Sequence, residues 1–229
     1  MSKSEYIYLI DLDEYLLCRN LAKANCIISP LLIHYKTYKK IHPIYYLDLD
    51  KVLFDKKESQ IGFSSPRFYY ITLANWYNNG LKIGYKENNK FHLYSENEIN
   101  KILRVAQIQI EFEKIRRKIN PLLPSRLSSI FLANDDFDGR TMLKNMFFNR
   151  KKNFIIEKVK ITHKFLFFKA DYRWIEEYEK EKEEIYIYKY WLGENYDSIP
   201  SYEYLLEGRI ELLSNEGKAK VIEALNKFS

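Results

Sequence analysis

Residues 201–213 read SYEYLLEGRIELL and place a carboxylate, Glu203, at the entrance of an apolar run. The run at 204–206 is tyrosine followed by two leucines, a composition that favours a buried strand. We therefore expect the strand to fix the backbone of Glu203 and to hold its carboxylate in a defined direction.

A second segment, residues 124–133 (PSRLSSIFLA), carries an arginine and two serines directly before another apolar run. Arg126 offers a planar fork of donors that suits a phosphate or a carboxylate. Ser128 and Ser129 add hydroxyl groups at the edge of the expected strand. We expect this segment to meet the segment around Glu203 in space, so that the two form halves of one site.

The rest of the chain predicts strands with helices interspersed. Strands or extended pieces are expected at residues 6–12, 31–35, 43–48, 81–85, 91–94, 129–133, 153–162 and 164–169. Helices are expected at residues 13–24, 97–119, 140–149, 170–191 (a charged surface helix) and 215–228, whereas the type of the run 68–77 stays open. Residues 50–68 are polar, with a turn signal at 62–66. Because regular strand–helix–strand alternation is missing, the pattern favours an α+β fold over a doubly wound sheet.

The longest expected helix, at 97–119, has the clearest local signal. Ser95 and Glu98 form a capping box, in which each side chain can bond the backbone of the other residue. The apolar positions that follow keep near-helical spacing. This helix should end at Asn120, because Pro121 follows.

Composition sets broad limits on the protein. The 229 residues, of which 46% are hydrophobic, suit one domain spanning residues 1–229. The net charge of +6 permits an anionic partner but does not require one, because the lysines are dispersed. The N-terminus shows no apolar leader, and the two cysteines suit a reducing compartment. We expect a cytoplasmic protein that does not contact a membrane.

Several common sites are excluded by spacing. The four histidines lack zinc-ligand spacing, so no metal site is expected. The seven glycines form no phosphate-binding loop. Asp11 and Asp13 resemble the paired carboxylates of haloacid-dehalogenase-type phosphatases, but Tyr15 departs from that motif, so phosphatase chemistry is not favoured.

Taken alone, the polar residues of the two segments have plain explanations. Ser128 and Ser129 could be ordinary polar residues of a strand edge, and Glu203 could be a surface carboxylate. A glutamate on a strand can also stabilise a developing cation or orient a nucleophile.

Family resemblance adds to this reading. The chain resembles an uncharacterised bacterial domain family, number 2441, through PSRLSSIF at 124–131, KAD at 169–171, YWLGE at 190–194 and YEYLLEG at 202–208. The resemblance is strongest over residues 100–213, and the N-terminal half is elaborated. The family is similar to ADP-ribosyltransferases, which implies an ADP-ribosyltransferase-like split β-sandwich with peripheral helices.

The resemblance also implies a function and a set of roles. NAD would bind in a cleft, and ADP-ribose would pass to a protein or nucleic-acid acceptor. Glu203, Ser128 and Ser129 would be catalytic, whereas Arg126 and Tyr8 would bind the cofactor. A role as a toxin, in phage defence or in counter-defence would fit such an enzyme.

The N-terminal strand departs from the family pattern, because Tyr6 and Tyr8 stand where a histidine or arginine is expected. This departure supports an alternative from another class: a catalytically inactive module of the same fold that binds nucleic acid or a partner protein. The segment 35–40 (YKTYKK) suits base stacking beside phosphate, although it could equally be a solvated edge.

Overall fold

The fold is organised around β7 (Tyr202–Leu212), the strand that the segment at 201–213 forms. The computed structural model describes residues 6–55, 65–87, 90–147 and 153–228. Along one edge β7 pairs with β5 (Ile130–Asn134) and β2 (Cys26–Ile28), and along the other with β6 (Phe154–Asp171). All three pairings are antiparallel.

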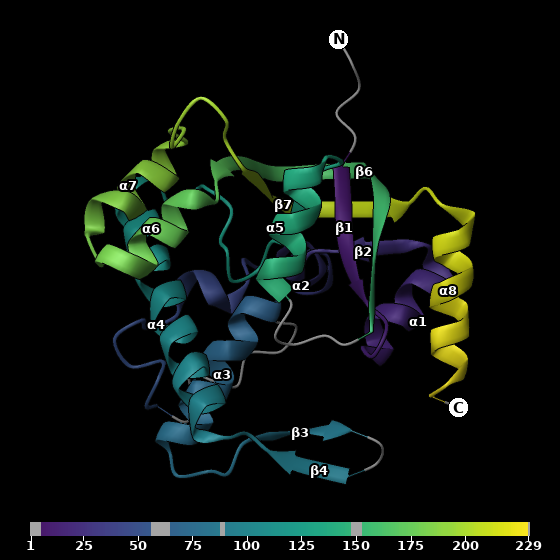
Figure 1. The fold of residues 1–229 in the computed structure, drawn as a ribbon, viewed down its shortest axis with the longest axis horizontal. Coiled ribbons are helices and arrows are strands. Elements are labelled where there is room, and N and C mark those ends of the chain that lie inside the picture. The colour runs from purple at the N-terminus through teal and green to yellow at the C-terminus, as the bar shows by residue number, and fades with distance from the viewer. Residues whose placement is uncertain (1–5, 56–64, 88–89, 148–152, 229) are drawn as a thin grey trace.

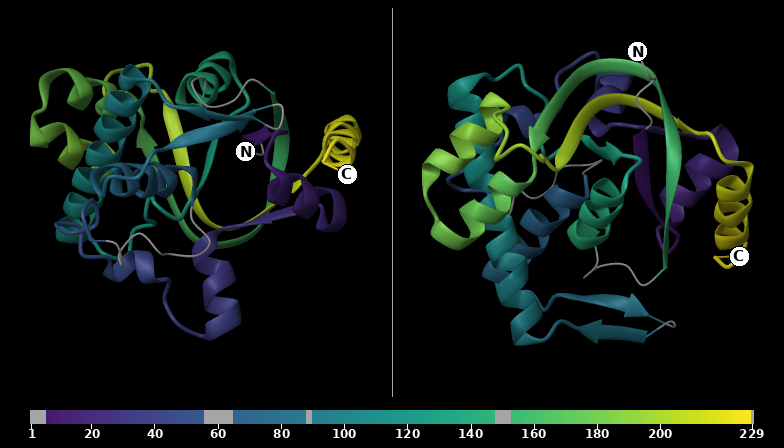
Figure 2. Two further views of the ribbon diagram at one scale, coloured as in Figure 1. Left: turned by 90° about the horizontal axis from the view of Figure 1, so that it is seen from below. Right: turned by 45° about the horizontal axis from the view of Figure 1, so that its top comes forward.

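The sheet closes on itself. Strand β1 (Tyr6–Asp11) pairs with β5 on one side and with the first half of β6 on the other. The pairings β7–β5–β1–β6–β7 therefore form a ring. Figure 2 shows that closure depends on a strong bend, with β6 and β7 arching together over the other strands. Two register shifts in β6, between Ile161 and His163 and between Lys164 and Leu166, lie within this arch.

Helices cover the sheet from two sides (Figure 1). The long helix α4 (Glu96–Ile119) packs with α3 (Pro66–Asn78), while α6 (Arg173–Glu181) and α7 (Glu184–Leu192) lie beside it. On the opposite side α1 (Tyr15–Ala24) packs against α8 (Asn215–Asn226). The remaining elements are α2 (Pro30–Tyr38), the 3-10 helix η1 (Pro43–Tyr46), α5 (Phe137–Phe147) and the hairpin β3 (Gly84–Glu87) and β4 (Lys90–Leu93).

Strand alternation separates two cores on the two faces of β7. Leu205 belongs to a cluster with Phe112, Phe131 and Trp191 beneath α4 and α7. Leu206 belongs to a cluster on the other face, which α1 and α8 cover. Successive side chains of a strand point to opposite faces, so Glu203 and Glu207 lie on the same face of β7 as Leu205.

Much of the predicted pattern is confirmed, including the α+β class with an antiparallel sheet. The capping box is present: the Ser95 side chain accepts from the Glu98 backbone N–H, and the Glu98 side chain accepts from the Ser95 backbone N–H. The helix expected at 97–119 is α4, and those expected at 13–24 and 215–228 are α1 and α8. The open run at 68–77 is helical, as α3, with the Ser65 side chain accepting from the first turn. The helix expected at 140–149 is α5, which begins earlier, at Phe137.

Other expectations were wrong for identifiable reasons. Residues 31–35 are helical because Pro30 occupies the first turn of α2, where its fixed φ suits a helix. Residues 43–46 form η1 for the same reason, with Pro43 at its start. The strands expected at 153–162 and 164–169 are one continuous strand, β6, whose register shifts absorb its irregular middle.

The helix expected at 170–191 is two helices. Lys182 adopts a left-handed conformation (φ 61°) that ends α6. These helices are not a charged surface element either, because Trp174, Tyr190 and Trp191 are buried. Residues 81–85 and 91–94 contribute to one hairpin, β3–β4. Most of the turn signal at 62–66 lies outside the described residues. The last two residues of the helix expected at 140–149 also lie outside them.

Candidate functional site

The two segments that open the sequence analysis do meet. β5 pairs antiparallel with β7, with Ile130 opposite Leu206 and Ala133 opposite Glu203. Glu203 lies within β7 rather than before it, and its side chain is fully buried. It points to the same face as Leu205 and toward α4 and α7, because residues two apart on a strand share a face.

Arg126 is the counter-charge of Glu203. Its guanidinium Nη1 forms an ion pair with Glu203 Oε1, and the Tyr190 hydroxyl donates to the same oxygen. Arg126 Nε donates to Gln109 Oε1 at 3.1 Å. The guanidinium also lies 5.2 Å from the ring centre of Phe131. These contacts occupy Nε and Nη1 of the arginine, so those donors serve the fold before any ligand.

Burial shapes the electrostatics of this pair. It lowers the pKa of the Arg126 guanidinium, and the neighbouring Tyr190 opposes part of that shift. Burial raises the pKa of Tyr190 to about 12, although Arg126 opposes the shift. Tyr190 is therefore a neutral hydroxyl that donates to Glu203.

Ser128 and Ser129 contact a different carboxylate, Glu207. The Ser128 hydroxyl donates to Glu207 Oε1, and Ser129 Oγ lies 3.4 Å from the same atom. The register explains this choice: with Ile130 opposite Leu206, the residues just before Ile130 lie beside Glu207 and beyond the reach of Glu203. The structure thus brings Arg126 to Glu203, but it brings the serines to a neighbouring site.

Glu207 has an altered acidity. Burial raises the pKa of its carboxyl to about 7, and hydrogen bonds from Ser128, Ser29 and Ser129 oppose part of that shift. The side chain is fully buried. A neutral carboxyl near pH 7 can donate as well as accept, so this group can exchange a proton under ordinary conditions.

A third buried carboxylate, Glu113, anchors the turn that carries Arg126. Arg116 donates two hydrogen bonds to the Glu113 carboxylate, of 2.9 and 2.7 Å, and Arg117 donates a third of 3.0 Å. Ser125 Oγ donates to Glu113 Oε2 at 2.8 Å. Arg116 Nη1 also donates to the carbonyl oxygens of Pro121 and Leu123, each at 2.7 Å. The position of Arg126 is therefore set by charges on α4.

Three polar atoms of this region keep bonding capacity. Arg126 Nη2, Glu203 Oε2 and Glu207 Oε2 are buried and have no hydrogen-bond partner among the described residues. Buried polar atoms are rarely left in this state, and each calls for an explanation. A ligand that entered this region would form its hydrogen bonds with these three atoms.

Tyr8 lies elsewhere. It packs with Tyr6 against the core cluster that contains Leu206, whereas Leu205 belongs to the cluster on the other face. Burial raises the Tyr8 pKa, with smaller effects from Asp11 and Glu14. The structure does not bring Tyr8 to Glu203.

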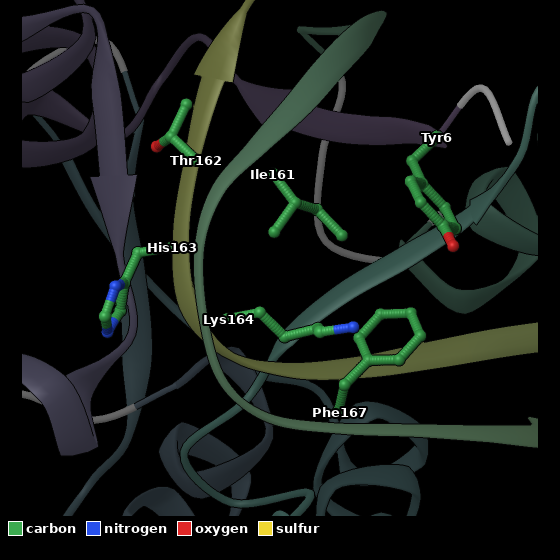
Figure 3. Close-up of a pocket in the computed structure, with 6 residues that line it drawn as sticks. All are labelled: Tyr6, Ile161, Thr162, His163, Lys164 and Phe167. Atoms are coloured by element: carbon green, nitrogen blue, oxygen red, sulfur yellow. The ribbon is translucent and has the colours of Figure 1, made fainter. Parts of the chain in front are cut away.

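An open pocket of about 350 Å³ lies inside the bend of β6, and we call it the β6 pocket. It is lined by Tyr6, Ile161, Thr162, His163, Lys164 and Phe167. Figure 3 shows Tyr6, Ile161, Lys164 and Phe167 converging on one side of β6, whereas His163 points away from them. The volume falls at the lower end of the ~300–1,000 Å³ typical of ligand sites.

Aromatic rings continue from the pocket along the sheet. Phe167 and Tyr204 stack with centroids 5.6 Å apart and planes 20° apart. Tyr6 meets the Tyr204 ring edge-on at 5.1 Å. Lys164 lies 5.5 Å from the Phe167 ring centre, and Lys169 lies 3.9 Å from that of Tyr202. The pocket therefore combines the rings of Tyr6 and Phe167 with the cation of Lys164, and Lys169 lies outside its lining.

Sequence reasoning missed several of these residues. The spacing of Glu203 and Glu207 could have identified the second carboxylate, because residues four apart on a strand share a face. The β6 pocket had no comparable signal, since it depends on the bend and the register shifts of β6.

The comparisons identify the family. A family model described as "Protein of unknown function (DUF2441)" matches residues 33–224. The chain belongs to this family. No curated protein matches the chain.

Two further observations concern what the described residues lack. No three His, Cys, Asp or Glu side chains in that part of the chain gather as metal ligands would. None of the described helices combines the length and the apolar character that a membrane span needs.

The Arg126–Glu203 pair makes a prediction about stability. Arg126→Met should lower the free energy of unfolding by about 3–5 kcal/mol, because it leaves the Glu203 charge buried and unpaired. Adding Glu203→Gln should restore part of the loss by removing that charge. Urea unfolding of both variants measures the two effects.

A matched control is Arg140→Met, since Arg140 pairs with Asp135 while its own side chain is 41% exposed. It should cost at most about 1 kcal/mol. Equal losses for Arg126→Met and Arg140→Met would contradict a structural role for the buried pair.

Glu207 makes a prediction about pH. Its folded-state pKa, about 7, lies above the ordinary value of 4.5. The folded state therefore binds the proton more tightly, and this contribution to stability is complete below pH 4.5 and lost as pH rises through 7. Between those limits, wild type should lose about 3 kcal/mol relative to Glu207→Gln, which has no such proton. Unfolding both proteins at acidic and alkaline pH tests this, and a constant difference would refute it.

Proposed function

We propose that the protein is a binding module that holds single-stranded nucleic acid in the β6 pocket. The observation that carries the proposal is the pair of half-buried rings that line the pocket, Tyr6 and Phe167, beside Lys164. The buried Tyr204 ring stacks behind Phe167 and holds it in place. Proteins that bind single strands combine aromatic faces, on which bases stack, with a basic groove that follows the phosphates. The proposal takes up the inactive-module alternative of the sequence analysis.

Lys164, which lines the pocket, and Lys169, which lies on the Tyr202 ring, are available for phosphate. Lys164 and Lys169 are exposed, and within residues 6–55, 65–87, 90–147 and 153–228 neither forms an ion pair. Each instead lies against an aromatic ring. Of the described residues that line the pocket, none carries a carboxylate. A phosphate would therefore meet attraction without a compensating acidic group.

ADP-ribosyl transfer from NAD is the second candidate, together with the ADP-ribosyltransferase-like split β-sandwich that the resemblance implies. The ion pair of Arg126 with Glu203, one residue from each segment of the resemblance, favours it. In this mechanism Glu203 would stabilise the cationic ribose as the bond to nicotinamide breaks. Ser128 and Ser129 would support the ribose, and Arg126 and Tyr8 would hold the cofactor.

The burial of Glu203 weighs against this candidate as the resting arrangement. Its carboxylate is fully buried and already neutralised by Arg126. A substrate could reach it only if the pair separated, and breaking a buried pair costs several kcal/mol. The β6 pocket needs no such opening, so binding on that face is the simpler function.

The binding proposal predicts a salt dependence. Wild type should bind an oligothymidine more weakly as salt rises, because each phosphate contact releases counterions. Lys164→Ala with Lys169→Ala should weaken binding at low salt and reduce the logarithmic salt slope by about 1.4, the value for two contacts to a single strand. Fluorescence anisotropy over about 50–300 mM salt measures both.

The control replaces two other lysines. Lys220 and Lys227 lie on or just after α8, and Lys220→Ala with Lys227→Ala removes the same net charge. That variant should bind as wild type does. Equal effects of the two double variants would mean that the net charge, and not the pocket, attracts the oligonucleotide.

The two candidates differ in a second measurement. With labelled NAD and a cell lysate as the source of acceptors, wild type should neither consume NAD nor transfer label, because Glu203 is enclosed. If wild type does turn NAD over, Glu203→Gln should lower the rate by about 10²–10³ when Glu203 is the electrostatic stabiliser. Turnover by wild type alone would be enough to replace the binding proposal with the transferase.

A further inference from the structure

A second aromatic surface lies beside the β6 pocket, at the next residue of β6. Phe165 follows Lys164 at a register shift of the strand, and it contacts α2 rather than lining the pocket. Phe165 stacks on Tyr35 of α2, with centroids 6.3 Å apart and planes 17° apart. The two side chains are 52% and 47% exposed, respectively. Two exposed rings that already lie nearly parallel present a flat apolar surface to solvent.

Three lysines follow Tyr35 within five residues, in the last turn of α2 and just after it. Lys36, Lys39 and Lys40 are exposed, and among the described residues none of them forms an ion pair. The backbone N–H of Lys39 donates to the Tyr35 carbonyl oxygen at 2.9 Å, which ends α2 beside the ring. We call Tyr35, Phe165 and these three lysines the α2 surface. Its charge complements a phosphate backbone.

The edge of β6 separates the α2 surface from the β6 pocket. The pairing of β6 with β1 ends at Val159. From Ile161 onward, β7 is the only described strand that pairs with β6, so the other edge of β6 has no strand partner there. The register shift between Lys164 and Leu166 lies at this position. Lys164 and Phe165 are consecutive, with Cα atoms about 3.8 Å apart along the chain, so the two surfaces adjoin each other at this edge.

We infer that a nucleic-acid strand held in the β6 pocket crosses the edge of β6 and continues over the α2 surface. Its further bases stack on Tyr35 and Phe165, and its phosphates lie at Lys36, Lys39 and Lys40. This inference rests on the proposed function, because the pocket supplies the first bases. It adds a second subsite and makes affinity depend on oligonucleotide length.

The experiment compares oligothymidines of about 4 and about 12 nucleotides, the lower and middle parts of the range that single-strand sites occupy. Anisotropy at low salt gives the affinity of each. Wild type should bind the longer strand more than tenfold more tightly. Tyr35→Ser with Phe165→Ser should remove most of that gain and leave the affinity for the short strand unchanged.

The matched control uses another exposed Tyr–Phe pair. Tyr15 and Phe228 are each 45% exposed, with ring centroids 5.6 Å apart. Tyr15→Ser with Phe228→Ser should keep the full length dependence. Thermal melts should show all variants folded, since the replaced side chains are exposed.

The outcomes separate this inference from the proposed function. If wild type binds both lengths equally, the pocket stands and the α2 surface is overturned. If wild type prefers the long strand but Tyr35→Ser with Phe165→Ser keeps that preference, the α2 surface is again overturned. If wild type binds neither length, the proposed function fails and the inference fails with it. A third variant, Lys36→Gln with Lys39→Gln and Lys40→Gln, should lower the salt slope for the long strand only.

Discussion

Strand β7 carries two carboxylates on its buried face, and the rest of the structure has to satisfy them. An unpaired charge in a protein interior costs several kcal/mol, so each group needs a partner or a proton. Glu203 obtains Arg126, and Glu207 obtains serine hydroxyls and a raised pKa. Most of these partners come from the short turn between α4 and β5, which Glu113 holds in place through Ser125.

This requirement explains why the segment at 124–129 has so many polar residues. Its arginine and serines look like a ligand site in the sequence, yet in the folded chain they bind carboxylates of the protein itself. Tyr204, the neighbour of Glu203, faces the other way and joins the aromatic rings near the β6 pocket. Both faces of β7 are therefore buried: one holds the polar network, and the other holds the core that lies behind the rings of the β6 pocket.

Features that depend on residues close together in the sequence were predicted, whereas features that depend on contacts between distant segments mostly were not. The capping box at Ser95 is a local signal, and it located the start of α4. The meeting of residues 124–133 with 201–213 was also predicted, with help from family resemblance. The pairing of Ser128 with Glu207 was not, because it depends on the register between β5 and β7, which neither segment encodes alone. The bend of β6, and with it the pocket, arises only when β1 and β7 pair with different halves of the same strand. The proposed ligand and the NAD chemistry both remain predictions.

The closed ring of strands has a consequence for how the chain reaches its native state during synthesis. β1 and β2 lie near the N-terminus, but β2 pairs only with β7 among the described strands, with Cys26 opposite Glu211. Ribosomes add roughly 5–20 residues per second, so β2 waits on the order of ten seconds for its partner, whereas β1 can pair earlier with β5 and β6. Until β7 is made, β2 has no described strand to pair with and the ring of strands stays open. A chain that stops before β7 therefore leaves the edges of β5 and β6 unpaired, and unpaired strand edges promote aggregation.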